Sequence, residues 1–350
     1  MIKRRTLLTS SAAAAFGLCA QAATPQAPVV LKFHTFMSSL SNVWLAMHKP
    51  WMDKVEKESV GRIRFEAYPS MQLGGTPVQL YDQAKDGVVD IVWTLPGYTS
   101  GRFPRIEAFE LPFMMSDAEA TSKALWDYVH TVAGDEFKDT HLLAVNVHGP
   151  GVIHTGSKPV KSVADLRGLK MRAPTRQVTR LLGALGATPV GMPLPGIADA
   201  LTKGTIAGCA LPWEVVPSVK VHELTRYHAE FDPAGGALYT AGFVLAMNKT
   251  RYNALPPDLR KVLDNNSGLA TSGWLGKVQQ SGDAAGRKAA TDRGNTVFTV
   301  NAAEAQDFRR QSRAIELDWM DDMNKRGLDG RRLLETARSL IDKHTKPPKI

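Results

Sequence analysis

Short apolar runs alternate with longer amphipathic segments along most of the chain. Apolar or alternating runs of about four to eight residues predict β-strands, and apolar residues recurring three and four positions apart predict helices. The predicted strands are 29–36, 61–68, 88–93, 142–148, 152–154, a strand carrying Arg172, a strand around Cys209, 240–248 and 296–300. The predicted helices cover about 42–59, 77–86, 117–133, 177–185, 197–203, 217–223, 257–293 and 302–326.

Strands that alternate with helices indicate βαβ units and a mostly parallel sheet, so the predicted fold class is α/β. Gly149-Pro150-Gly151 ends the fourth strand and predicts a hinge into a second α/β unit. Strand 240–248 is predicted to return the chain to the first unit. Ligands of open α/β sheets bind beyond the carboxyl ends of the strands, so two such units predict a cleft.

The N-terminus has the pattern of an export signal. Lys3, Arg4 and Arg5 precede an apolar stretch, and Ala20-Gln21-Ala22 fits a small-x-small cleavage site. The two arginines also suit a twin-arginine signal, so both export routes stay open. We therefore expect residues 1–22 to be removed and the protein to be periplasmic.

Composition excludes several classes of protein. The chain has 350 residues, 43% of them hydrophobic, and no apolar run of about 18 residues that would span a membrane. The formal net charge is +9, and it falls to +6 when the three basic residues of the signal are removed. The basic residues are scattered and form no stripe with interleaved aromatics, so no nucleic-acid partner is expected.

Catalytic and metal-binding motifs are absent from the sequence. It contains no G-x-S-x-G, H-E-x-x-H, C-x-x-C, G-x-G-x-x-G or P-loop pattern, and its nine histidines are scattered. Cys209 is the one cysteine after residue 22, so no intrachain disulfide is expected and a buried thiol is predicted. We expect no enzymatic activity, no metal and no cofactor.

Arg172 is the clearest candidate for a ligand-binding residue. It ends a short apolar strand, and Pro174 biases Ala173 toward extended geometry before the chain turns away. A guanidinium offers five donors in a fixed fork and stays charged, which suits a carboxylate. A surface arginine or a structural salt bridge is the alternative.

Ordered fragments along most of the chain resemble the solute-binding (DctP-like) proteins of tripartite ATP-independent periplasmic (TRAP) transporters. Their order and spacing hold from about residue 31 to 263. They are Tyr68-Pro-Ser-Met-Gln-Leu-Gly-Gly75, Gln83-Ala-Lys-Asp-Gly-Val-Val-Asp90, Phe103-Pro104, Leu111-Pro-Phe113, Val163-Ala-Asp-Leu-Arg-Gly-Leu-Lys-Met-Arg-Ala-Pro174, Gly186-Ala-Thr-Pro189 and Met247-Asn-Lys-Thr-Arg-Tyr-Asn-Ala-Leu-Pro256.

The resemblance implies a two-lobed periplasmic binding protein with a central cleft, its lobes joined by hinge strands and a long spanning helix. It also implies an organic acid ligand, held by an arginine that matches Arg172, and delivery to integral-membrane TRAP permease subunits. The oligomeric state stays open between a monomer and a homodimer. The expected domains are 29–149 with 240–274 for lobe I, 150–239 with 275–326 for lobe II, and 327–350 for a C-terminal helix and tail.

Departures from the family pattern point to the chemistry of the ligand. Val152 stands where sialic-acid-binding members have a second arginine, and Leu211 follows Ala210 where a polar pair is usual. Phe36 and Leu95 occupy cleft positions that are otherwise polar. A pocket with few hydrogen-bonding groups disfavours a polyol, because each desolvated unpaired group costs about 1–3 kcal/mol. We expect a monocarboxylate with an apolar or aromatic body, with 2-oxo and 2-hydroxy acids both open.

The other candidate site residues are aromatic or titratable. Trp93, Tyr98 and Trp213 are candidate walls together with Phe36, and core packing is the alternative for each. His148 and His154 flank the hinge and are candidate donors to a ligand carbonyl or hydroxyl. Glu214 is expected either to accept from a ligand or to hold Arg172. A binding protein of an ATP-driven importer, a periplasmic ligand sensor and an exported hydrolase are the competing functions.

Overall fold

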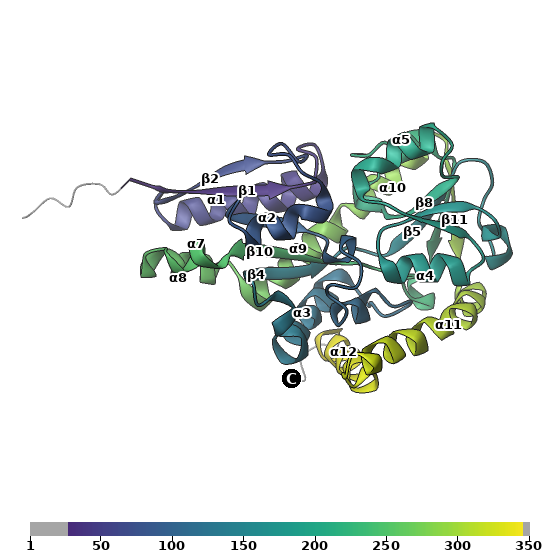
Figure 1. Cartoon of the computed structure of the whole chain (residues 1–350). Helices are drawn as coiled ribbons and strands as arrows, with labels where there is room; N and C mark the ends of the chain where they lie inside the picture. The colour runs from purple at the N-terminus through teal and green to yellow at the C-terminus, as the bar shows by residue number, and fades with distance from the viewer. Residues whose placement is uncertain (1–26, 346–350) are drawn as a thin grey trace, which may run out of the picture.

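Two β-sheets flanked by helices form two lobes, at the left and right of Figure 1. This arrangement comes from a computed structural model that describes residues 27–345. The expected signal, residues 1–22, lies outside the described residues. The predicted α/β class is confirmed, since both lobes combine strands and helices.

The first sheet has the strand order β2-β1-β3-β10-β4. Strand β1 pairs in parallel with β2 and β3, and β10 runs antiparallel between β3 and β4. All residues of β3 and β10 are buried, as expected for central strands covered on both faces. The strands are β1 (Val29–Thr35), β2 (Ile63–Tyr68), β3 (Ile91–Thr94), β4 (Thr140–Val147) and β10 (Gly242–Asn248).

The second sheet has the order β11-β9-β5-β8-β6-β7. Strand β9 was not predicted, because it carries the polar residues His228 and Glu230. Their partners are distant in sequence: His228 Nδ1 lies 2.7 Å from His154 Nδ1, and Glu230 accepts from Trp213 Nε1 at 3.1 Å. The strands are β5 (Gly151–Thr155), β6 (Lys170–Ala173), β7 (Thr188–Gly191), β8 (Gly208–Pro212), β9 (Tyr227–Phe231) and β11 (Thr296–Val300).

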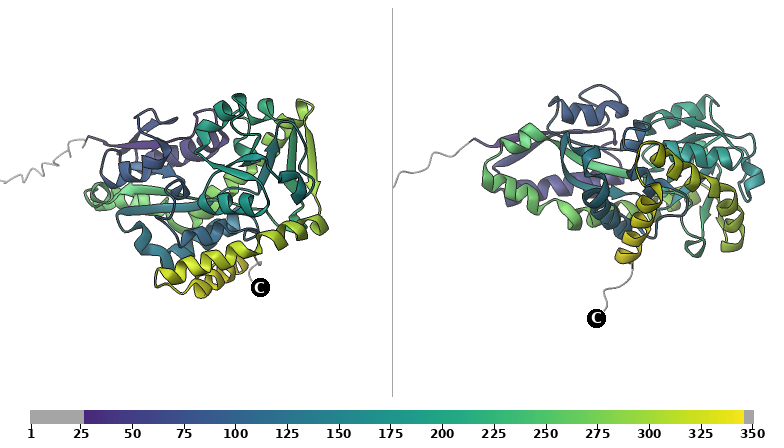
Figure 2. Two further views of the ribbon diagram at one scale, coloured as in Figure 1. Left: turned by 45° about the vertical axis from the view of Figure 1, so that its right-hand side comes forward. Right: turned by 60° about the horizontal axis from the view of Figure 1, so that its bottom comes forward.

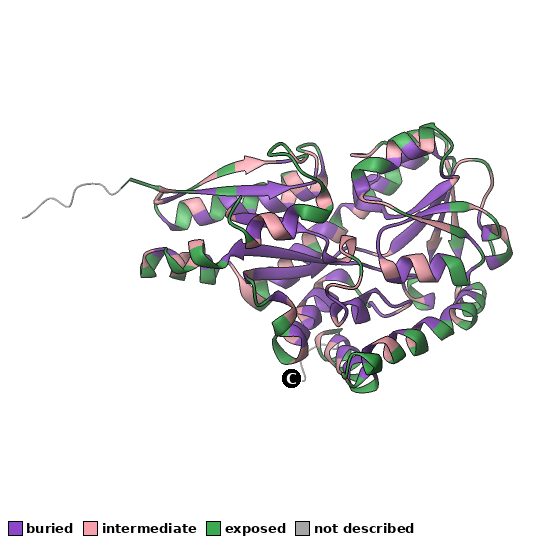
Figure 3. Ribbon diagram, in the orientation of Figure 1, coloured by how far each residue is buried: buried purple, intermediate pink, exposed green. Residues whose placement is uncertain are grey.

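Helices cover the outer faces of both sheets, and Figure 3 shows their buried sides turned toward the strands. The segment 257–293 was predicted as one helix and is three. Asn266 ends the first, Gly268 at φ +85° starts the second, and Gly282 separates the second from the third. The α-helices are α1 (Lys49–Glu58), α2 (Leu80–Lys85), α3 (Ala118–Tyr128), α4 (Arg176–Ala184), α5 (Ile197–Thr202), α6 (Val221–Leu224), α7 (Lys249–Asn253), α8 (Pro257–Asn265), α9 (Gly268–Ser281), α10 (Asp283–Asp292), α11 (Ala302–Lys325) and α12 (Gly330–Thr345).

The chain crosses between the sheets from β4 to β5, from β9 back to β10, and from α9 to α10. Helix α9 packs on α3 and β4 of the first lobe, and α10 packs on α6 and β11 of the second. The expected boundary at residues 274 and 275 therefore falls inside α9. Helix α11 runs from α4 to α12, which packs on α3 (Figure 2).

A glycine is required at the first crossing. The backbone N–H of Gly151 donates to the carbonyl of Tyr239 at 2.9 Å, so two of the crossing segments lie against each other. A Cβ atom at Gly151 would lie 2.0 Å from the Tyr239 ring. The predicted hinge thus packs against an aromatic residue that lines the candidate site. Within residues 27–345, no helix is both long and apolar enough to cross a membrane.

Candidate functional site

A cavity lined by residues of both sheets lies between the lobes. Its walls come from the carboxyl ends of β1, β3, β6 and β8, the residue after β4, and the start of the antiparallel β10. This is the edge at which α/β sheets bind ligands. Most of the predicted site residues line it, namely Phe36, Trp93, Leu95, Tyr98, His148, Arg172, Leu211 and Glu214.

Arg172, in β6, is the cationic group of this cavity. Its side chain is held by two backbone carbonyls: Nε donates to Met192 O at 2.9 Å and Nη1 to Ala210 O at 3.0 Å. Arg172 is 2% exposed, and no carboxylate among the described residues forms an ion pair with it. Because a guanidinium has five N–H donors, three remain after these two bonds. The arginine is therefore oriented by the protein and still able to bind an anion.

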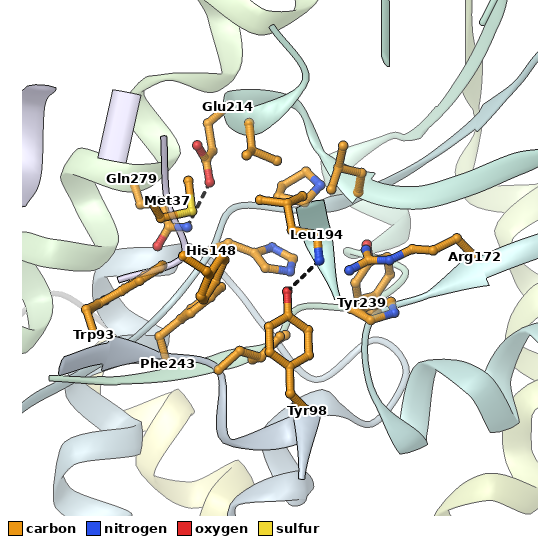
Figure 4. A pocket seen from close by; sticks show the side chains of 17 residues that line it. Met37, Trp93, Tyr98, His148, Arg172, Leu194, Glu214, Tyr239, Phe243 and Gln279 are labelled. Carbon is orange, nitrogen blue, oxygen red and sulfur yellow. Dashed lines mark hydrogen bonds between the residues drawn. The ribbon is translucent and has the colours of Figure 1, made fainter. Parts of the chain in front are cut away.

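Tyr98 adds a neutral donor close to Arg172. It lies on the 3₁₀ turn η3 (Pro96–Tyr98) that follows β3, and its hydroxyl oxygen accepts from the backbone N–H of Leu194 at 3.0 Å. Burial raises the pKa of Tyr98, and the Arg172 charge opposes that shift. The hydroxyl thus stays protonated at neutral pH, and its own proton is available to a ligand. Figure 4 shows this bond beside Arg172.

Aromatic rings form much of the remaining wall. Trp93 stacks on Phe243 with centroids 4.2 Å apart and an interplanar angle of 8°. Phe36 lies 5.7 Å from Trp93 and 5.4 Å from Tyr98, measured between ring centroids. Aromatic walls favour a further ring packed against them, offset-stacked or edge-on. The cavity therefore suits a flat apolar body next to an anionic group.

His148 follows β4 and lines the cavity beside these rings. Its Nδ1 lies within hydrogen-bond distance of Gly149 O, and 3.4 Å from Thr240 Oγ1. The ring meets Tyr239 edge-on, with centroids 5.5 Å apart and an angle of 85°. Burial lowers the pKa of His148 to about 4; the hydrogen bond to Gly149 opposes this shift and the charge of Arg172 contributes to it. The imidazole is therefore neutral near pH 7.

Glu214 is fixed by a chain of buried hydrogen bonds. Trp93 Nε1 donates to Asn146 Oδ1 at 3.1 Å, and Asn146 Nδ2 donates to Gln279 Oε1 at 2.7 Å. Gln279 Nε2 then donates to Glu214 Oε1 at 2.8 Å. Oε2 of Glu214 has no partner among the described residues. Burial raises the pKa of Glu214 to about 8, aided by the charge of Asp283.

Three predicted site residues do not line this cavity. Val152, in β5, is covered by its neighbours in the sheet and pairs with Leu211. Both ring nitrogens of His154 are engaged, Nδ1 by His228 and Nε2 by the carbonyl of Leu211 at 3.0 Å. The Trp213 ring packs on His154 and His228, away from the cleft.

Several lining residues were not found from the sequence. Tyr239 and Phe243 flank the start of β10, and that end becomes part of the site because β10 runs antiparallel to β3. The predicted strand 240–248, which contains Phe243 and directly follows Tyr239, was the sequence signal that could have found both residues. Gln279 carried no local signal, since it comes from a helix. The remaining lining residues are Met37, Pro174, Leu194, Pro212, Val215 and Ala241.

The buried thiol predicted for Cys209 is confirmed. Cys209, in β8, is fully buried, and burial raises the pKa of its thiol to about 12. Within residues 27–345, no group of three or more His, Cys, Asp or Glu side chains is placed to hold a metal ion.

The fold and this cleft define a class of two-lobed ligand receptor. Residues 33–320 match the family of bacterial extracellular solute-binding proteins, family 7, and the chain belongs to that family. The predicted resemblance to TRAP solute-binding proteins and the two-lobed architecture are therefore confirmed.

The solved structures that are similar to this chain include three with bound aromatic acids. A TRAP solute-binding protein from Rhodoferax ferrireducens T118, in complex with copurified benzoate, is 72% identical with a TM-score of 0.90, covering 91% of this chain and 98% of its own. A marine metagenome TRAP solute-binding protein specific for aromatic acid ligands, with 3-hydroxybenzoate, is 50% identical with a TM-score of 0.90 (92% and 100% covered). A TRAP protein from Bordetella bronchiseptica, with (R)- and (S)-mandelate, is 28% identical with a TM-score of 0.83 (90% and 99%).

Proposed function

We propose that this chain binds an aromatic monocarboxylate in the closed cleft and delivers it to the membrane permease of a TRAP transporter. The observation that carries the proposal is the buried guanidinium of Arg172, which has no carboxylate partner among the described residues and faces a cavity walled by aromatic rings. The proposed role is binding and release, with no chemical conversion of the ligand.

The energetics favour an anion at Arg172. Burying a charge without a counterion costs several kcal/mol, and backbone carbonyls offset only part of that cost. A ligand carboxylate supplies the missing negative charge and accepts from the free N–H groups in a bidentate geometry. The hydroxyl of Tyr98 is a third donor for the same carboxylate. The rest of the cavity offers few polar partners, which favours one carboxylate over two.

The relatives support the aromatic body of the ligand. The 72% identical protein contains benzoate, and the 50% identical protein is described as specific for aromatic acids. The stacked pair Trp93 and Phe243, together with Phe36, is a matching surface for a ring in this chain.

Closure of the lobes couples binding to transport. The first lobe contributes Phe36, Trp93 and Tyr98 to the cavity and the second contributes Arg172, so a ligand contacts both lobes only when they are closed. A ligand with more contacts in the closed form shifts the population toward it. We propose that the permease recognises this closed form at the periplasmic face, after export directed by residues 1–22, with a monomer or homodimer as the carrier.

Isothermal titration calorimetry tests the proposal. The protein is first unfolded, dialysed and refolded, so that any copurified acid is removed. Benzoate and 3-hydroxybenzoate should bind, while benzamide, which keeps the ring but lacks the charge, should bind much more weakly. Succinate and sialic acid serve as the dicarboxylate and polyol controls. Tighter binding of either control than of benzoate would contradict the proposed ligand class.

A further inference from the structure

We propose that His148 makes the cavity select acids with a hydroxyl on the carbon that carries the carboxylate, and disfavour the matching 2-oxo acids. The inference rests on the proposed function, because it takes the carboxylate to be bound at Arg172. It reverses the donor role that the sequence predicts for His148, and it chooses between the 2-oxo and 2-hydroxy acids that the sequence leaves open.

Hydrogen bonds fix the tautomer of His148. Nδ1 faces two groups, the carbonyl of Gly149 and the hydroxyl of Thr240. The Thr240 hydroxyl donates its proton to the carbonyl of His148 at 2.7 Å, so toward the ring its oxygen can only accept. Both neighbours of Nδ1 are therefore acceptors, and Nδ1 carries the proton. A neutral imidazole has a single N–H, so Nε2 presents a lone pair.

The position of the ring directs this lone pair into the ligand site. His148 lines the cavity, and Figure 4 shows its imidazole pointing toward Tyr98 and the side of the site where Arg172 lies. Tyr239 and Phe243 pack against the ring at centroid distances of 5.5 and 6.2 Å, which holds its orientation. Nε2 makes no hydrogen bond to any described residue. Burial and the nearby guanidinium both favour the neutral ring.

The three groups around the ligand carboxylate thus differ in whether they donate or accept hydrogen bonds. Arg172 and Tyr98 donate, and His148 Nε2 accepts. A hydroxyl on the adjacent carbon donates to Nε2 while the carboxylate stays on the arginine. A 2-oxo group at the same place brings a carbonyl oxygen against the lone pair, so two acceptors meet without a proton between them and one hydrogen bond is lost.

The test compares three acids that differ at one carbon: phenylacetate, mandelate and phenylglyoxylate. Calorimetry at pH 7.5 on the full mature protein should rank the tighter mandelate enantiomer first, about 3- to 10-fold above phenylacetate, with phenylglyoxylate about 10-fold or more below mandelate. In His148→Gln the amide both donates and accepts, so the ratio of mandelate to phenylglyoxylate affinity should fall toward one. Should that variant not fold, ¹⁵N NMR of histidine-labelled wild type reports the tautomer directly, and Nδ1–H is expected.

The outcomes separate this inference from the proposed function. The role of His148 would be overturned if phenylglyoxylate bound as tightly as mandelate, or if the NMR spectrum showed the Nε2–H tautomer. If phenylacetate still bound in that case, the proposed function would stay intact. Affinities for all three acids that rise about tenfold per pH unit on acidification would also overturn it, because His148 would then be protonated on binding. Absence of binding by every aromatic acid would remove the proposed function, and this inference with it.

Discussion

Replacing Arg172 by lysine is the most direct perturbation of the proposed site. The lysine ammonium keeps the positive charge and loses the fork that lets one side chain hold two carbonyls and a carboxylate together. In the folded protein two N–H groups are committed to Met192 O and Ala210 O, so the free ones are aimed at the cavity. A charge-assisted hydrogen bond contributes about 1.5–3 kcal/mol, and the lysine gives up at least one of them to the ligand. The dissociation constant for benzoate should therefore rise about 10- to 150-fold.

Calorimetry of Arg172→Lys beside Arg167→Lys measures this loss. Arg167 is exposed and lies in the same segment, so its replacement controls for the change of residue type. Thermal unfolding without ligand is recorded for both, because Arg172 also satisfies two buried carbonyls and its loss lowers stability. An affinity within about threefold of wild type, in a variant that is still folded, would refute the assignment of Arg172 as the carboxylate ligand.

Three further outcomes follow from the surroundings of the cavity. An aromatic acid should change the intrinsic fluorescence, and Trp93→Phe should lose most of that change; an undiminished signal would show that the ligand ring lies away from Trp93. Burial raises the pKa of Glu214 from 4.5 to about 8, so the folded protein holds a proton that the unfolded chain releases between these values. The free energy of unfolding therefore falls as pH rises through this window, by up to about 1.4 kcal/mol per pH unit. In urea unfolding, the stability of Glu214→Gln relative to wild type should rise from pH 5 to 8. Curves of unfolding free energy against pH that run parallel for the two proteins would contradict this. Cys209 should resist iodoacetamide until the protein is unfolded, and peptide mapping that finds it alkylated in native protein would disprove the closed environment.

Much of the fold follows from local pattern. Strands β3 and β10 are central and buried on both faces, so their side chains are almost uniformly apolar and the runs are visible in the sequence. Strand β9 escapes the same reasoning because His228 and Glu230 are satisfied only by partners far along the chain. The break between α8 and α9 depends on the positive φ of Gly268, and a glycine in a helical pattern does not by itself reveal that conformation.

The sequence by itself determined the α/β class and the strand end that carries Arg172, because apolar periodicity and a proline after a strand act on neighbouring residues. It also determined the family, through the resemblance of ordered fragments to TRAP solute-binding proteins. Only the tertiary structure decided which groups meet in the cavity. It engages His154 with His228 and Leu211, and it brings Tyr239 and Phe243 in through an antiparallel strand. Within residues 27–345 it also leaves Arg172 without a carboxylate partner. The tertiary structure also decided which ring nitrogen of His148 carries the proton, because Gly149 and Thr240 both face Nδ1. Hydrogen-bond partnership and burial depend on atoms brought together from both lobes, and no local pattern encodes those distances.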